Sequence, residues 1–153
     1  MMLLTGTFPR LIDDKGRIAI PKPLRDCLND GSAQATALFV TPGTDGSLAI
    51  YPESTFTQLG ARFAQASPTA RDVRDFSRMF YSQAVRVELD KQGRMRLPQE
   101  LTMMAGLDKE AVLVGVQDRL ELWDRQRWQD YLAEKTAQYD EIAEAAFGGN
   151  VGN

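Results

Sequence analysis

The chain has 153 residues, of which 43% are hydrophobic, and a formal net charge of −3 at pH 7. These values are typical of a folded protein with one ordinary core or two small ones, and they exclude a disordered or collagen-like polymer. One cysteine, Cys27, and no histidine are present, which excludes disulfide frameworks, the usual zinc sites and histidine-based catalytic triads within one chain. We therefore expect a protein that is not an enzyme, with no catalytic residues, metal, cofactor or small-molecule substrate.

The hydropathy and charge patterns bear on cellular location and on binding to nucleic acid. The chain contains no apolar run of about eighteen residues, and Thr5-Gly6 interrupts its start before a signal-peptide core forms. We expect a cytoplasmic protein without a membrane partner. Basic side chains outnumber acidic ones at 1–28 and 62–78, whereas the acidic excess lies at 121–144. The net charge therefore does not exclude a basic surface that binds nucleic acid.

An internal repeat is the most informative feature. The block at 13–21 recurs at 90–98, and such self-similarity indicates a repeated structural unit. An offset of 77 positions aligns Asp13 with Asp90, Gly16 with Gly93, Arg17 with Arg94, Pro21 with Pro98 and Leu24 with Leu101. Further along, 38–40 aligns with 112–114 and 48–51 with 120–123.

Each block predicts a strand, a tight loop and a second strand. Apolar and polar residues alternate from 85 to 97, which is the period of a half-buried strand. Gly16 and Gly93 suit the loop position that needs a positive φ, and Asp13 and Asp90 are placed to accept backbone N–H groups across the loop.

The elements that follow each block are also similar. We expect short helices at 24–28 and 100–105, then hairpins with strands at 37–41 and 47–51 and at 111–116 and 120–123. Further helices are expected to begin at Glu53 or Ser54, to run from Thr69 to Phe80, and to extend from an Asp124 cap to Gly148. The fold class is therefore α+β. Because four strands and one helical turn bury too little apolar surface alone, the two units are expected to share one core by pseudo-twofold pairing.

These residues resemble the MraZ family of bacterial transcriptional regulators. The resemblance covers nearly the whole chain, and it rests on 13–17 with 20–21, on 89–94 with 97–98, and on 113–115 and 121–123. It implies two SpoVT/AbrB-type β-loop-β-α-β-hairpin repeats that form a small double-ψ or swapped-hairpin barrel with flanking helices. Arg96 stands where that family commonly has an apolar or neutral residue.

The resemblance also implies domain limits and a function. The limits are 7–54 for the first repeat, 55–82 for a helical connector, 83–126 for the second repeat, 127–147 for a C-terminal helix and 148–153 for a flexible tail. The implied function is sequence-specific binding of double-stranded DNA by a ring-shaped homo-oligomer associated with the nucleoid. The implied sites are short direct repeats in the promoter of the division and cell-wall gene cluster, which the protein regulates together with its own gene.

The loop residues fit this function chemically. Arg17 and Arg94 carry planar donors that match O6 and N7 of guanine. Phosphate contacts are expected from Lys15, Arg10, Lys22 and Lys91. Asp13, Gly16, Asp90 and Gly93 are expected to shape the loops.

Structural explanations compete with these functional ones. Arg17 and Arg94 each have an aspartate four residues earlier and are equally suited to locking the loop. The arginines between Arg62 and Arg78 alternate with acids, which favours a salt-bridged surface or a subunit interface. The aromatic side chains expected to face inward are Phe56, Phe63, Phe76, Phe80, Trp123 and Trp128.

Two other functions remain open. One is an antitoxin-like DNA-binding module of the same fold class, which neutralises a protein partner through its acidic C-terminal helix. The other is an assembly protein without a role in nucleic-acid binding, which would show no salt-dependent retention of DNA.

Overall fold

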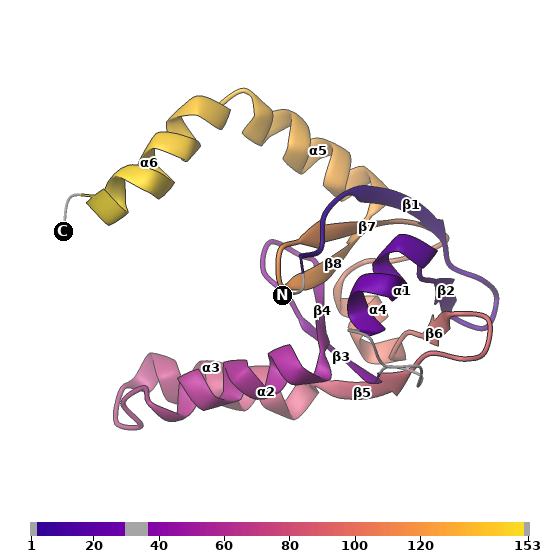
Figure 1. Ribbon diagram of the computed structural model, residues 1–153, viewed down its shortest axis with the longest axis horizontal. Coiled ribbons are helices and arrows are strands. Elements are labelled where there is room, and N and C mark those ends of the chain that lie inside the picture. The colour runs from indigo at the N-terminus through magenta and orange to yellow at the C-terminus, as the bar shows by residue number, and fades with distance from the viewer. Residues whose placement is uncertain (1–2, 30–36, 152–153) are drawn as a thin grey trace.

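The computed structural model describes residues 3–29 and 37–151. The first half of the chain contains β1 (Thr7–Leu11), β2 (Arg17–Ala19), α1 (Lys22–Asn29), β3 (Ala37–Pro42), β4 (Leu48–Pro52), α2 (Glu53–Ala64) and α3 (Arg71–Gln83). The second half contains β5 (Val85–Glu88), β6 (Arg94–Arg96), α4 (Gln99–Met104), β7 (Glu110–Val116), β8 (Arg119–Asp124), α5 (Arg125–Thr136) and α6 (Tyr139–Val151). Figure 1 shows these elements in chain order.

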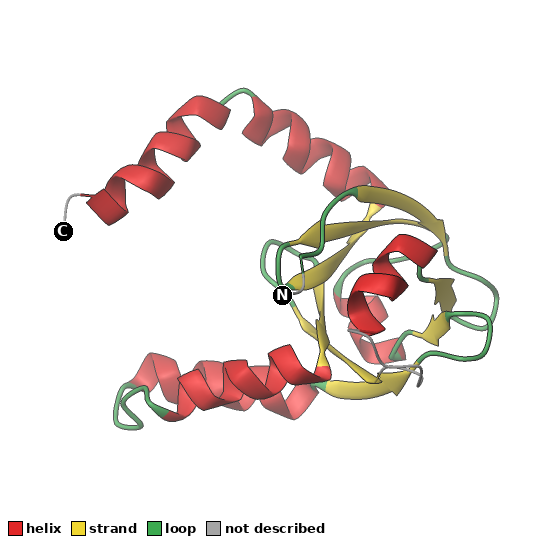
Figure 2. Cartoon of the chain, in the orientation of Figure 1, coloured by secondary structure: helices red, strands yellow, loops and turns green. Residues whose placement is uncertain are grey.

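The strands form an antiparallel sheet and a separate ribbon, so the α+β class is confirmed. Six strands pair in the order β1-β7-β8-β4-β3-β5, and β2 pairs with β6 alone. The sheet curves around α1 and α4 (Figure 2). A small barrel was expected, but the sheet does not close into one, because the edge strands β1 and β5 do not pair with each other. β1 leads through its loop into β2, and β5 leads through its loop into β6. The ribbon therefore contacts both edge strands of the sheet.

Strand pairing relates the two repeats by a pseudo-twofold axis, as the sequence predicted. In the ribbon, Ile18 pairs with Met95, while Arg17 pairs with Arg96 and Ala19 with Arg94. The axis thus passes between Ile18 and Met95. In the sheet, β1 of the first repeat pairs with β7 of the second, and β5 of the second pairs with β3 of the first. The repeats therefore exchange strands rather than pack as separate units.

The predicted alignment of β3 with β7, the third strand of each repeat, is wrong by one residue. Leu38 and Val40 lie in the core, and so do Ala111 and Leu113, whereas Val112 belongs to a separate cluster on the other side of the sheet. Residue 38 therefore corresponds to 111 and not to 112. A shift of one residue in a strand exchanges its two faces, so the correction decides which side chains cover the outside.

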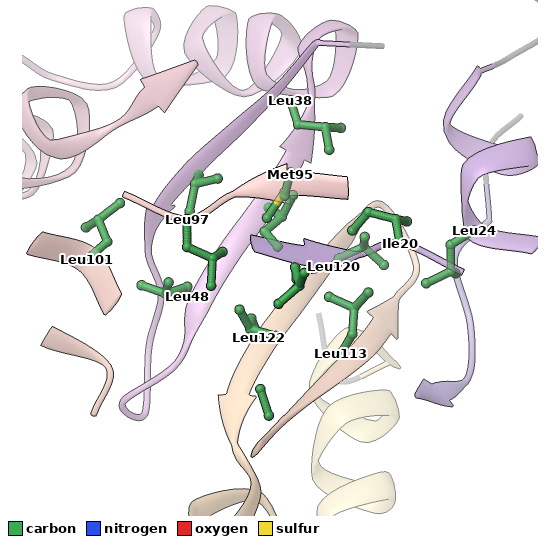
Figure 3. Packing of buried hydrophobic residues seen from close by; sticks show 14 of the residues in the cluster. Ile20, Leu24, Leu38, Leu48, Met95, Leu97, Leu101, Leu113, Leu120 and Leu122 are labelled. Carbon is green, nitrogen blue, oxygen red and sulfur yellow. The ribbon is translucent and has the colours of Figure 1, made fainter. Parts of the chain in front are cut away.

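One hydrophobic core unites both repeats. Its members come from all of the β-strands except β1 and β5 and from α1 and α4, and side chains of both repeats converge on one interior (Figure 3). Fully buried members are Leu4, Ile18, Leu38, Val40, Leu48, Ile50, Met95, Leu113, Leu120 and Leu122. Because Ile18 and Met95 fill this core from the ribbon, their neighbours along β2 and β6 face outward.

The longer helices project from the sheet as two arms, α2–α3 and α5–α6 (Figure 1). The first arm is held by aromatic contacts, with Phe39 stacked on Phe56 at 4.3 Å between ring centroids. In the second arm, Trp128 lies 5.3 Å from Trp123 of β8. No helix in the described part of the chain is long and apolar enough to cross a membrane.

Several helix boundaries differ from the prediction. Asp124 caps α5 as expected, because its carboxylate accepts the N–H of Arg127 at 3.1 Å. The residue before α2 is Pro52, which supplies no side-chain cap. The predicted C-terminal helix is two helices, and α6 continues past Gly148 to Val151. Residues 152 and 153 of the expected tail lie outside the described residues.

Not all of the aromatic side chains face inward. Phe80 and Trp123 are buried, and Phe56, Phe63 and Trp128 are half-buried against their neighbours. Phe76 is 43% exposed, contrary to the prediction, although its ring stacks on Phe63 and on Phe80.

Candidate nucleic-acid interface

The loop between β1 and β2 is closed by one carboxylate. Asp13 Oδ1 accepts the backbone N–H groups of Lys15 and Arg17 at 3.0 and 2.8 Å, and Oδ2 accepts Nε–H of Arg17 at 2.8 Å. Gly16 has a φ of +75°, in the left-handed region that glycine enters at no steric cost. The sequence Asp-x-x-Gly-Arg thus encodes a loop that fixes the start of the Arg17 side chain.

The loop between β5 and β6 repeats this geometry. Asp90 Oδ1 accepts the N–H groups of Gln92 and Arg94 at 2.9 Å each, and Oδ2 accepts Nε–H of Arg94 at 2.9 Å. Gly93 has a φ of +76°. The pairing of each arginine with the aspartate four residues earlier is therefore present in both loops.

Both loop carboxylates are held in the ionised form. The backbone N–H of Arg17 is the largest cause that lowers the pKa of Asp13 below its ordinary value of 3.8, with further lowering by the Arg17 side chain and the Lys15 N–H, against partial desolvation. Asp90 has a lowered pKa for the same reason, chiefly the backbone N–H of Arg94. Hydrogen bonds to the charged form explain both directions.

Both arginines keep donors for another partner. Within the described residues, Nε is the only side-chain nitrogen of Arg17 and of Arg94 that makes a hydrogen bond, so their terminal nitrogens have no partner there. Each loop aspartate orients a guanidinium group without occupying all of its donors.

The ribbon brings the arginines of the two repeats onto one face. Because Ile18 and Met95 point into the core, alternation along the strands places Arg17, Arg94 and Arg96 on the opposite face. This ribbon face, defined by residues 17, 19, 94 and 96, carries three arginines from the two repeats. A two-stranded ribbon is one of the elements narrow enough to enter the major groove of DNA.

The four remaining predicted site residues lie on the elements that adjoin the two ribbon strands along the chain. Arg10 lies on β1, and its Nη1 donates to the Ala19 carbonyl at 3.4 Å. Lys15 and Lys91 are exposed in the two loops. Lys22 begins α1, where its Nζ lies 3.1 Å from the Asp26 carboxylate.

Sequence reasoning did not assign a site role to two arginines. Arg96 is exposed on the ribbon face, and Arg25 of α1 donates from Nε to the Ile20 carbonyl at 3.0 Å. The offset of 77 aligns Arg96 with Ala19 and Arg25 with Thr102. Comparison of the two copies position by position would have singled out both residues as basic side chains present in one copy only.

The described residues contain no group of three metal-ligating side chains. Cys27 is exposed on α1. The ribbon face and its loops thus offer positively charged donors, which suit an anionic polymer.

Comparison with known proteins identifies the family. The family model described as "MraZ protein, putative antitoxin-like" matches residues 3–79 and 80–150. The chain belongs to the MraZ family. Each matched segment of this MraZ chain contains one of the two loops.

Curated MraZ relatives agree with this assignment. The protein named "Transcriptional regulator MraZ" of Lactobacillus delbrueckii subsp. bulgaricus is 39% identical over 142 residues, which cover 93% of this chain and 95% of the relative. The protein of that name from Finegoldia magna is 38% identical, with 87% and 89% covered. The one from Lactiplantibacillus plantarum is 39% identical, with 91% and 94% covered.

Proposed function

We propose that this protein is a sequence-specific DNA-binding transcriptional regulator that reads DNA with the ribbon face. The observation that carries the proposal is the outward presentation of Arg17, Arg94 and Arg96 by one two-stranded ribbon. The names of the MraZ relatives support the regulatory role. The proposed location is the cytoplasm, in association with the nucleoid.

The loop geometry supports readout of bases as well as phosphates. Since Asp13 holds Nε of Arg17, the two terminal nitrogens are presented together, as a bidentate contact to guanine requires. Lys15 and Lys91 at the loop tips are suited to phosphates, which position the protein without carrying sequence information. Arg10 and Lys22 would extend that contact on the first repeat.

We further propose that binding requires a homo-oligomeric ring on short direct repeats. A net charge of −3 makes each subunit a weak binder, whereas several aligned ribbons act at high effective concentration. The exposed apolar side chains on the arms, Phe76 and Met79 of α3 and Tyr139 and Ile142 of α6, support contact between subunits through the arms. The exchanged strands support membership in the swapped-hairpin class, and the proposed targets are its own promoter and that of the division and cell-wall cluster.

The test compares two substitutions at one position. Arg17→Ala removes the guanidinium group, whereas Arg17→Lys keeps a positive charge but loses the planar pair of donors. In gel-shift titrations at fixed salt on the promoter of its own gene, Arg17→Ala should weaken specific binding by about 1–3 kcal/mol per contact. Arg17→Lys should retain non-specific binding and lose discrimination between promoter and unrelated DNA.

Arg125→Ala, at the start of α5 where Arg125 is ion-paired with Glu110, is the matched control for loss of one positive charge. Mass measurement in solution should give the same oligomer for every variant. Unchanged promoter affinity of a folded Arg17→Ala oligomer would refute readout by the loop.

An antitoxin-like module is the second candidate. Its support is α6, which carries Asp140, Glu141 and Glu144 without a basic residue and exposes Tyr139 and Ile142. This function predicts that a chain truncated before α6 still binds DNA but no longer protects cells against a growth-arresting protein encoded by an adjoining gene. Equal protection by the truncated chain would exclude α6 as the neutralising element.

A further inference from the structure

The ribbon face departs from the pseudo-twofold symmetry at one position. Arg17 and Arg94 correspond to each other, whereas Arg96 corresponds to Ala19. Both Ala19 and Arg96 are exposed. The end of the ribbon next to the first loop therefore carries two arginines, Arg17 and Arg96, and the other end carries Arg94 opposite an alanine.

Arg17 and Arg96 are direct cross-strand partners. The ribbon hydrogen bonds from Ile20 N–H to Gly93 O and from Leu97 N–H to Gly16 O make Arg17 and Arg96 a non-hydrogen-bonded pair, the type in which the Cα atoms lie about 4.5 Å apart. Like charges directly opposite each other destabilise a ladder. An anion between the two side chains would relieve this repulsion.

Arg96 has no partner of its own to offset that repulsion. Within residues 3–29 and 37–151 it makes no hydrogen bond or ion pair, whereas Arg17 is paired with Asp13. Its exposed guanidinium group therefore keeps all of its donors for a ligand.

The surroundings of the two loops also differ, with more open space beside the first loop than beside the second. A side-chain carbon on Gly16 would meet no atom within 4 Å, whereas one on Gly93 would meet Arg25 at 2.8 Å. The space beside Gly16 is a hollow lined by Asp14, Lys15, Gly16, Arg96 and Thr102, among others. Thr102 occupies the position that Arg25 has in the first repeat, and its shorter side chain leaves the hollow open. The first loop thus combines an open hollow with the unpaired Arg96.

We propose that Arg96 fixes the direction in which each subunit lies on its DNA site, by making with Arg17 a two-arginine contact that the other end of the ribbon cannot make. This inference rests on the proposed DNA-binding function. A ribbon with equal ends would read a symmetric site in either direction, because site symmetry mirrors protein symmetry. The Arg96 side chain makes the ends unequal and selects one orientation on a non-palindromic repeat.

The test uses the only cysteine in the chain as an orientation probe. An iron chelate that cleaves nearby DNA is attached to the exposed Cys27, and the assembled oligomer is bound to the promoter fragment of its own gene. Cys27 lies to one side of the pseudo-twofold axis, so a single orientation cuts one flank of each protected repeat. Position 104 corresponds to position 27 in the second repeat, and Met104 is 51% exposed. In the variant Cys27→Ser/Met104→Cys the chelate is attached at position 104, and the cuts should move to the other flank.

Two opposite substitutions give positions 19 and 96 of the ribbon face the same residue. Arg96→Ala gives alanine at both positions and should weaken specific binding by roughly 5- to 100-fold per repeat. Ala19→Arg gives arginine at both positions and should leave affinity equal or higher. With the chelate on Cys27, both variants should give cleavage on both flanks of each repeat. Because Ala19→Arg keeps the affinity, it shows that the loss of orientation does not result from weaker binding. Melting temperature and mass in solution verify that each variant is folded and assembled.

The outcomes distinguish this inference from the function on which it rests. One-sided cleavage by both folded variants would overturn the role of Arg96 and leave DNA binding intact. The absence of any protected repeat with the wild-type protein would overturn the proposed function itself.

Discussion

Gly16→Ala and Gly93→Ala form a matched pair, because they make the same change in two loops with different neighbours. Both glycines have a φ near +75°, where an alanine costs about 1–2 kcal/mol relative to its preferred conformations. At Gly16 nothing else opposes the new carbon, but at Gly93 it lies 2.8 Å from Cδ, Nε and Cζ of Arg25. The Arg25 side chain is flexible and would move, at the expense of its hydrogen bond to the Ile20 carbonyl.

The expected difference follows from that bond. An intramolecular hydrogen bond contributes about 0.5–1.5 kcal/mol, so Gly93→Ala should be less stable than Gly16→Ala by about 1 kcal/mol. For a chain of this size, that difference lowers the melting temperature by about 3 °C. Thermal unfolding followed by circular dichroism measures it, at one protein concentration because assembly shifts the transition.

Arg25→Ala supplies the control. In that background the new carbon at position 93 meets no arginine, so Gly93→Ala should cost the same as Gly16→Ala within about 0.5 kcal/mol. The reasoning is refuted if Gly16→Ala is the more destabilising change, or if the difference persists without the Arg25 side chain.

Three further predictions concern the loops, a helix cap and the core. The lowered pKa values of Asp13 and Asp90 mean that these carboxylates stabilise the fold above their ordinary pKa of 3.8, and that this contribution is lost as the pH falls through the lower folded value. Melting temperatures measured from pH 6 to pH 3 should therefore fall less steeply in Asp13→Asn/Asp90→Asn, and an unchanged acid slope would contradict the assignment. Asp124→Ala should lower stability by about 1 kcal/mol in urea unfolding, with Asp124→Asn close to wild type, because only the first removes the cap on α5. Leu120→Ala, at a fully buried position, should cost about 2–5 kcal/mol, whereas Leu11→Ala at a 74% exposed position should stay within about 0.5 kcal/mol.

The loops could be predicted from sequence because their determinants are local. An aspartate, a glycine and an arginine within five positions satisfy the same hydrogen bonds in both copies. The duplicated block also carried enough information to predict pseudo-twofold pairing. Local chemistry repeated in one chain is therefore strong evidence for both loop structure and symmetry.

The register of the third strands could not be obtained in that way. Residues 111–114 of β7 are apolar without interruption and buried on both faces of the sheet, so no alternation marks the side that faces the core. The position of Arg96 opposite Arg17 depends in the same way on pairing between strands that are 77 residues apart. The continuation of α6 past Gly148 was missed because glycine permits a helix to end without requiring it.

The strand exchange has a consequence for how the chain is made. Every strand pair except β3–β4 and β7–β8 joins the two repeats, so a ribosome that has released only residues 1 to 82 presents β1 and β2 without any partner and β3 and β4 with only each other. At about 5–20 residues per second, the second repeat follows some seconds later, and during that interval two nascent chains on one messenger are able to pair with each other. Conversely, a chain cut in the segment 65–70 between α2 and α3 should stay together as a non-covalent heterodimer, because each fragment completes the sheet of the other.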